Sequence, residues 1–100
     1  MHIISRSALL SFWQKFPNAQ PGLQGWYEQT KQARWQNFAE LRLVFSSADQ
    51  VKNLTIFNIG GNNYRLIAFV DYTYKKVFIR YVLTHSEYDK GKWENDSWYR

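Results

Sequence analysis

Residues 54–84, LTIFNIGGNNYRLIAFVDYTYKKVFIRYVLT, decide the fold class of this chain of 100 residues. Three apolar runs rich in β-branched and aromatic residues are separated by a Gly-Gly-Asn-Asn cluster at 60–63 and a tyrosine-rich turn at 71–76. Glycine and asparagine tolerate the positive φ angles that a tight hairpin needs. Apolar residues at nearly every position of the two later runs indicate that both sheet faces are at least partly covered. The stretch predicts three antiparallel strands, at 53–59, 64–71 and 76–84.

The chain upstream of this stretch begins with a short strand and a helix. Residues 2–5 are predicted to be the strand, and Ser5 is a candidate cap for a helix over residues 6–16. Proline cannot continue a helix, so Pro17 is expected to end it.

A second helix is predicted to open at Pro21 and Gly22, with an apolar face that turns polar toward Arg34. The two helices should form a hairpin. Residues 38–51 are irregular, and a short turn of helix at 46–50 fits as well as a loop. The predicted fold class is α+β, with two N-terminal helices packed on one face of a mainly antiparallel sheet.

Length and composition limit the possible functions. One hundred residues fit a single domain, 1–100, and leave little room for a deep cofactor pocket, so no cofactor is expected. The absence of cysteine excludes a thiolate nucleophile and the common zinc sites, and no metal is expected. No apolar run is long enough to span a membrane, and no secretory signal is visible, which favours the cytoplasm. A net charge of +5 favours a polyanion such as RNA or DNA, or indicates only a basic surface.

Two isolated arginines, Arg65 and Arg80, stand among apolar residues of the predicted strands. Strict alternation places Arg80 on one face with Phe78, Val82 and Thr84, and both arginines are candidates to line one concave surface. A guanidinium held on a strand can receive a phosphate through two hydrogen bonds. The alternative is an ordinary ion pair with Asp71, Glu87 or Asp89, or a side chain that extends from a sheet edge.

An imidazole and a phenol, His85 and Tyr88, follow the last predicted strand. A helical turn capped by Thr84 or Ser86 would place both on one side. Histidine transfers protons near neutral pH, and tyrosine can donate to a phosphate or stack on a base. A capping histidine and a core tyrosine are the alternatives.

The patterns FNxGGNxxR, at 57–65, and IRxVxTHxEYD, at 79–89, occur in succession. Together with the opening Met-His-Ile-Ile they resemble a HigB-type toxin of the RelE-like superfamily. The chain departs from the pattern in its tryptophan-rich helices and in its C-terminal tail, WENDSWYR at 93–100.

The resemblance implies a RelE-like fold and a metal-independent endoribonuclease, an mRNA interferase. Such a toxin cuts mRNA on the translating ribosome and is silenced by a cognate helix-turn-helix antitoxin of the HigA type. A non-catalytic RNA-binding module is the alternative. Carried over by motif position, the catalytic residues are Arg65 and Arg80 for the phosphate, His85 for proton transfer and Tyr88 to orient or stack the RNA. The weaker RNA-binding candidates are Lys52 for the backbone, and Asn58 and Asn62 for bases or for the hairpin turn.

Overall fold

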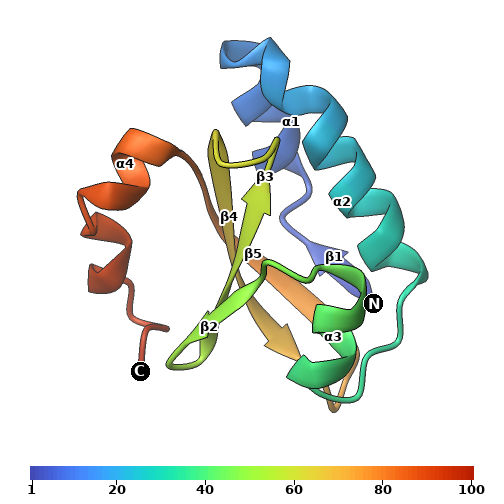
Figure 1. The fold of residues 1–100 in the computed structure, drawn as a ribbon. Coiled ribbons are helices and arrows are strands. Elements are labelled where there is room, and N and C mark those ends of the chain that lie inside the picture. The colour runs from blue at the N-terminus through green and yellow to red at the C-terminus, as the bar shows by residue number, and fades with distance from the viewer.

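A five-stranded sheet is the centre of the computed structural model, which describes residues 1–100 (Figure 1). Its order is β1-β5-β4-β3-β2; β1 runs parallel to β5, and the other neighbours are antiparallel. The strands are β1 (His2–Ile4), β2 (Asp49–Val51), β3 (Leu54–Ile59), β4 (Tyr64–Asp71) and β5 (Lys76–Thr84). The predicted three-stranded meander and the α+β class are confirmed, whereas β2 was not predicted.

Four α-helices and two 3-10 helices accompany the sheet. They are α1 (Ser7–Lys15), η1 (Pro17–Ala19), α2 (Gln20–Gln32), α3 (Phe38–Val44), α4 (His85–Asp89) and η2 (Lys92–Asn95). Pro21 lies in the first turn of α2, as predicted, and the buried residues of that helix lie on the predicted face. No helix is both long and apolar enough to cross a membrane.

One local prediction is wrong, and one open alternative is decided. Ser5 does not cap α1 with its side chain; its φ of 73° turns the chain out of β1, and its carbonyl accepts the N–H of Ala8. Of the two alternatives for residues 46–50, a helical turn or a loop, the structure has no helix there. The helix of this region lies earlier, as α3, because Asn37 Oδ1 caps it by accepting the Glu40 N–H at 2.9 Å. The polar residues after α3 lead instead into β2.

The sheet carries a separate apolar cluster on each face. Helices α1 and α2 contribute Leu9, Leu23 and Trp26 to the larger cluster, which includes Phe57 of β3. The C-terminal segment, residues 85–100, covers the opposite face of the sheet. The buried residues of the cluster on that face are Leu54, Ile56, Ile67 and Trp93. In Figure 1 the N-terminal helices and the C-terminal segment lie on opposite sides of the strands. Adjacent residues Ile56 and Phe57 thus reach different clusters, as the period of a strand requires.

A β-bulge in β5 changes the side-chain alternation at Arg80. Ile67 pairs with Tyr81, but the next residue, Ala68, pairs with Ile79, so Arg80 is the extra residue. Val82 packs against the helix-side cluster, whereas Arg80 lies over the ring of Trp98 in the tail-side cluster. The prediction that Arg80 shares a face with Val82 and Thr84 is therefore wrong, because strict alternation does not continue through a bulge.

Candidate functional site

Arg65 is a buried cation near the start of β4, with 8% of its surface exposed. The hairpin turn after β3 brings two main-chain carbonyls to the guanidinium, those of Asn62 at 3.0 Å and Tyr64 at 3.1 Å from Nη1. Nη2 lies 3.2 Å from Nδ1 of His85. The side chain is thus fixed by neutral acceptors.

No carboxylate pairs with Arg65. The ion pairs of the structure are Arg80 with Asp96 and His85 with Asp89. A buried guanidinium without a counter-ion is costly, and carbonyls recover only part of the lost hydration. Arg65 is therefore suited to receive an anion, and the ordinary ion-pair alternative does not apply to it.

His85 is the first residue of α4. Its main-chain N–H donates to the carbonyl of Asn63 at 3.0 Å, which ties the helix to the β3–β4 turn. Thr84 and Glu87 form a capping box, with hydrogen bonds of 3.1 Å and 3.0 Å, so the predicted capped turn is confirmed. Nε2 of His85 lies 3.1 Å from Oδ2 of Asp89, four residues later.

Tyr88 lies between a cation and a second aromatic ring. Its ring is stacked on Trp93, with centroids 5.4 Å apart and planes 7° apart, and the Arg65 guanidinium carbon lies 5.4 Å from its centroid. Burial raises the pKa of the Tyr88 phenol, and nearby carboxylates raise it further. The positive charge of Arg65 lowers it, but by less. The hydroxyl is therefore protonated at neutral pH and is a hydrogen-bond donor. Arg65, His85 and Tyr88 form one cluster.

Arg80 lies in a different network. Its Nη2 and Nε contact Asp96 Oδ2 at 2.8 Å and 3.2 Å, and its guanidinium stacks on Trp98 at 4.3 Å. Burial alone would raise the pKa of the Asp96 carboxyl, but hydrogen bonds from Arg80, the Trp98 N–H and Tyr81 outweigh it and lower that pKa. Arg80 retains 29% of its side chain exposed. This arginine has an ion pair, although with none of the three partners considered from the sequence.

The weaker RNA-binding candidates are divided between two ends of β3. Asn58 pairs with Arg65 across the strands, and the main-chain carbonyl of Asn62, in the hairpin turn, accepts from Arg65 Nη1. Lys52 lies in the β2–β3 turn, with a φ of 56°, and its ammonium is 4.4 Å from the Tyr99 ring centroid. The six residues of β3, at about 3.3 Å each, separate the two ends by about 20 Å. The structure does not bring Lys52 to the Arg65 cluster.

The sequence reasoning missed three contacts of the candidate side chains: Asp89 with His85, Asp96 with Arg80, and Trp93 with Tyr88. Asp89 follows His85 by four residues, a helical spacing that could have indicated their contact. Asp96 and Trp93 have no such signal, because they reach Arg80 and Tyr88 only through the path of the C-terminal segment.

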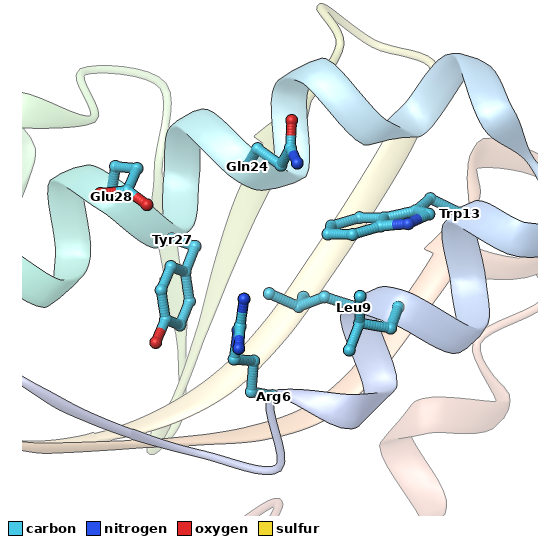
Figure 2. A pocket seen from close by; sticks show the side chains of 7 residues that line it. Arg6, Leu9, Trp13, Gln24, Tyr27 and Glu28 are labelled. Carbon is cyan, nitrogen blue, oxygen red and sulfur yellow. The ribbon is translucent and has the colours of Figure 1, made fainter.

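Other parts of the surface differ in character from this cluster. The largest cavity, about 460 Å³, lies between α1 and α2, where Arg6 packs over Tyr27 and Trp13 lines the other side (Figure 2). No group of three or more His, Cys, Asp or Glu residues is arranged to hold a metal ion. The buried cation beside an imidazole and a phenol is found only at the β3–β4 end of the sheet.

Comparison of the sequence with known proteins shows the family to which this chain belongs. A family described as the RelE-like toxic component of a toxin-antitoxin system matches residues 19–91. The chain is 32% identical over 93 residues to the mRNA interferase HigB of Escherichia coli O6:H1 (strain CFT073), which covers 90% of each chain. It is 35% identical over 92 residues to the mRNA interferase toxin HigB of Escherichia coli K12, covering 89% of this chain and 88% of that one. The mRNA interferase HigB of Shigella flexneri matches with the same figures.

The α+β fold and the family match define a RelE-like toxin. The chain belongs to the HigB toxin family.

Proposed function

We propose that this HigB-family toxin is an endoribonuclease, an mRNA interferase that cleaves mRNA on the translating ribosome. Residues 1–100 act as one toxin domain in the cytoplasm, without a metal ion, and a cognate helix-turn-helix antitoxin of the HigA type neutralises it. The family match and the relatives named mRNA interferase support the class of activity. A net charge of +5 suits an RNA substrate.

The buried, unpaired cation Arg65 carries the proposal. It contacts His85 at 3.2 Å and lies over the ring of Tyr88, and it has no carboxylate partner. A site that cleaves RNA without a metal needs a cation for the developing charge, a base and an acid. These three side chains supply one of each.

The proposed reaction is attack of the ribose 2′-oxygen on the adjacent phosphorus. His85 Nδ1 takes the 2′-hydroxyl proton, the O2′–P bond forms, and Arg65 stabilises the charge on the phosphoryl oxygens. The P–O5′ bond breaks, and the protonated Tyr88 hydroxyl donates to the leaving oxygen. The products are a 2′,3′-cyclic phosphate and a 5′-hydroxyl end, and solvent returns the protons to their starting groups.

The remaining candidates are proposed to bind the RNA outside the reacting phosphate. Arg80 presents its exposed edge to a phosphate while Asp96 retains the other edge. Lys52 contacts the RNA backbone at the far end of β3. Asn58 and Asn62 border the reacting site, where they contact bases or support the turn.

One observation favours the second candidate, a non-catalytic RNA-binding module. Both ring nitrogens of His85 are engaged in the free protein, by Arg65 and by Asp89. A phosphate-binding site without proton transfer would have the same arrangement. Cleavage therefore requires that RNA binding releases Nδ1.

The deciding experiment is cleavage of a translated message by purified protein in the presence of ribosomes. We expect the wild-type protein to cut the message and the cleavage rate of Arg65→Ala to be about 10²-fold lower. A decrease of this size is typical when one preorganised group that stabilises the developing charge is removed. Arg42→Ala removes the same charge from an exposed position of α3 and serves as the control, with an unchanged rate expected. Binding without cleavage by the wild type would establish the RNA-binding module instead.

A further inference from the structure

We infer that Asp89 is a positioning residue, which acts through His85 and sets the proton arrangement that the reaction needs. This inference rests on the proposed function. It is carried by a continuous chain of contacts, from Asp89 Oδ2 to His85 Nε2 at 3.1 Å and from His85 Nδ1 to Arg65 Nη2 at 3.2 Å. The acid lies on α4, the imidazole begins that helix, and the guanidinium comes from β4.

The donor at one end of the chain determines the tautomer of the ring. A guanidinium has only donors, so Nδ1 of His85 must accept the hydrogen bond from Arg65. In the neutral ring the proton is then on Nε2, which donates it to the Asp89 carboxylate. Asp89 therefore favours the tautomer whose lone pair lies toward Arg65.

This tautomer leaves His85 able to accept a proton once a phosphate is bound. The phosphate takes over the Nη2 donor of Arg65, because a charged oxygen is a stronger acceptor than an imidazole nitrogen. Nδ1 is then free, beside the phosphate, to accept the 2′-hydroxyl proton. The imidazolium that forms gains the adjacent negative charge of Asp89, in the way that the aspartate of a Ser-His-Asp triad stabilises its histidine.

Helix stability does not account for the Asp89 contact. The capping box of Thr84 and Glu87, and the His85 N–H bond to the Asn63 carbonyl, already hold α4 in place. The side chains of His85 and Asp89 are 52% and 60% exposed, and ion pairs at such positions stabilise a fold very little. Removal of Asp89 should leave the fold intact and affect the orientation and proton state of His85.

The test compares Asp89→Ala, His85→Gln and the double variant in ribosome-dependent cleavage, with RNA affinity measured in parallel. We expect Asp89→Ala to lower kcat about 10-fold, because the imidazole loses the carboxylate that orients it and stabilises its charged form, while RNA affinity stays within about twofold. The double variant should be no slower than His85→Gln alone, because Asp89 acts through the imidazole. Asp89→Glu should restore most of the rate.

A second readout follows the ring itself in the free protein. Nitrogen-15 NMR of labelled histidine should show the Nε2–H tautomer of His85 in the wild type and a mixture of tautomers in Asp89→Ala. Glu28→Ala removes a carboxylate from an exposed position of α2, on the other side of the sheet, and should change neither readout. Asp89→Asn, which is nearly isosteric, replaces the alanine variant if that variant loses thermal stability.

The outcomes separate this inference from the proposed function. A wild-type protein that cuts no message overturns the proposed function, and this inference with it. A wild-type protein that cuts, with Asp89→Ala equally fast, overturns this inference alone. So does a double variant whose rate loss is the product of the two single losses, since Asp89 would then act independently of His85.

Discussion

The atoms around Arg65 leave its positive charge available to an anion. Its guanidinium is bound by two carbonyls and an imidazole nitrogen in a site that is almost closed to solvent. Arg80, on the neighbouring strand, has a nearly buried carboxylate instead. Two arginines of similar sequence surroundings thus differ in their available charge, and Arg65 is the better anion site.

Substitution of His85 separates catalysis from binding at the scale of one residue. His85→Gln retains an acceptor for Arg65, so RNA or ribosome affinity should stay within a few-fold while cleavage falls about 10². Binding assays and single-turnover cleavage on the same protein measure the two effects. Full cleavage by this variant would assign the proton transfer to another group, with Tyr88 the next candidate.

The C-terminal segment is the element that completes the site. Trp93 supports the Tyr88 ring, Trp98 packs on Phe69 and Phe78, and the Arg100 N–H donates to Asn53 at 2.9 Å. Asp96 anchors the segment to β5 through its contacts with Arg80. The stability of the segment and the position of Tyr88 are therefore linked.

Loss of the Asp96 charge should loosen this segment. The pKa of Asp96 is lowered in the folded protein, so its contribution to stability is complete above the unfolded value of about 3.8 and is lost as the pH falls through the lower folded value. Asp96→Asn should cost about 1–3 kcal/mol at pH 7, because Arg80 is left without its partner. Thermal unfolding at pH 7 and pH 3 measures both effects.

Glu94→Gln is the control for this prediction, since it removes a carboxylate from η2, two residues before Asp96, without breaking an ion pair. Equal stability of Asp96→Asn and Glu94→Gln at pH 7 would contradict the anchoring role. An unchanged acid sensitivity in Asp96→Asn would show that other carboxylates govern unfolding at low pH.

At the scale of the whole molecule, the proposed RNA contacts come from separate parts of the fold, namely β4, β5 and the β2–β3 turn. If Arg65, Arg80 and Lys52 each neutralise one phosphate, the logarithm of the RNA association constant should fall with the logarithm of salt concentration with a slope of about −2. Lys52→Ala should make that slope less negative by about 0.7, because it removes one phosphate contact at the far end of β3. Titrations of RNA binding between about 50 and 200 mM salt measure this slope.

Arg42→Ala again provides a matched loss of charge, on α3, and should leave the slope unchanged. An unchanged slope for Lys52→Ala would exclude its contact with the RNA backbone and leave Arg65 and Arg80 as the proposed phosphate contacts.

Local sequence patterns determined the meander, the opening of α2 at Pro21 and the capped turn at Thr84. Each depends on residues within a few positions of one another, through strand period, hairpin chemistry or helix capping. The same local signals were enough to select Arg65, His85 and Tyr88 as candidates, since two motifs at successive strand ends contain them.

The tertiary structure alone decided which charges remain free. Asp96 reaches Arg80 from 16 residues away, and the bulge that turns Arg80 toward it depends on the pairing of β4 with β5. Strand β2 is short and mostly polar, so its own residues do not indicate that it pairs with β3. Contacts between distant segments are selected by packing of the whole chain, and no local pattern encodes them.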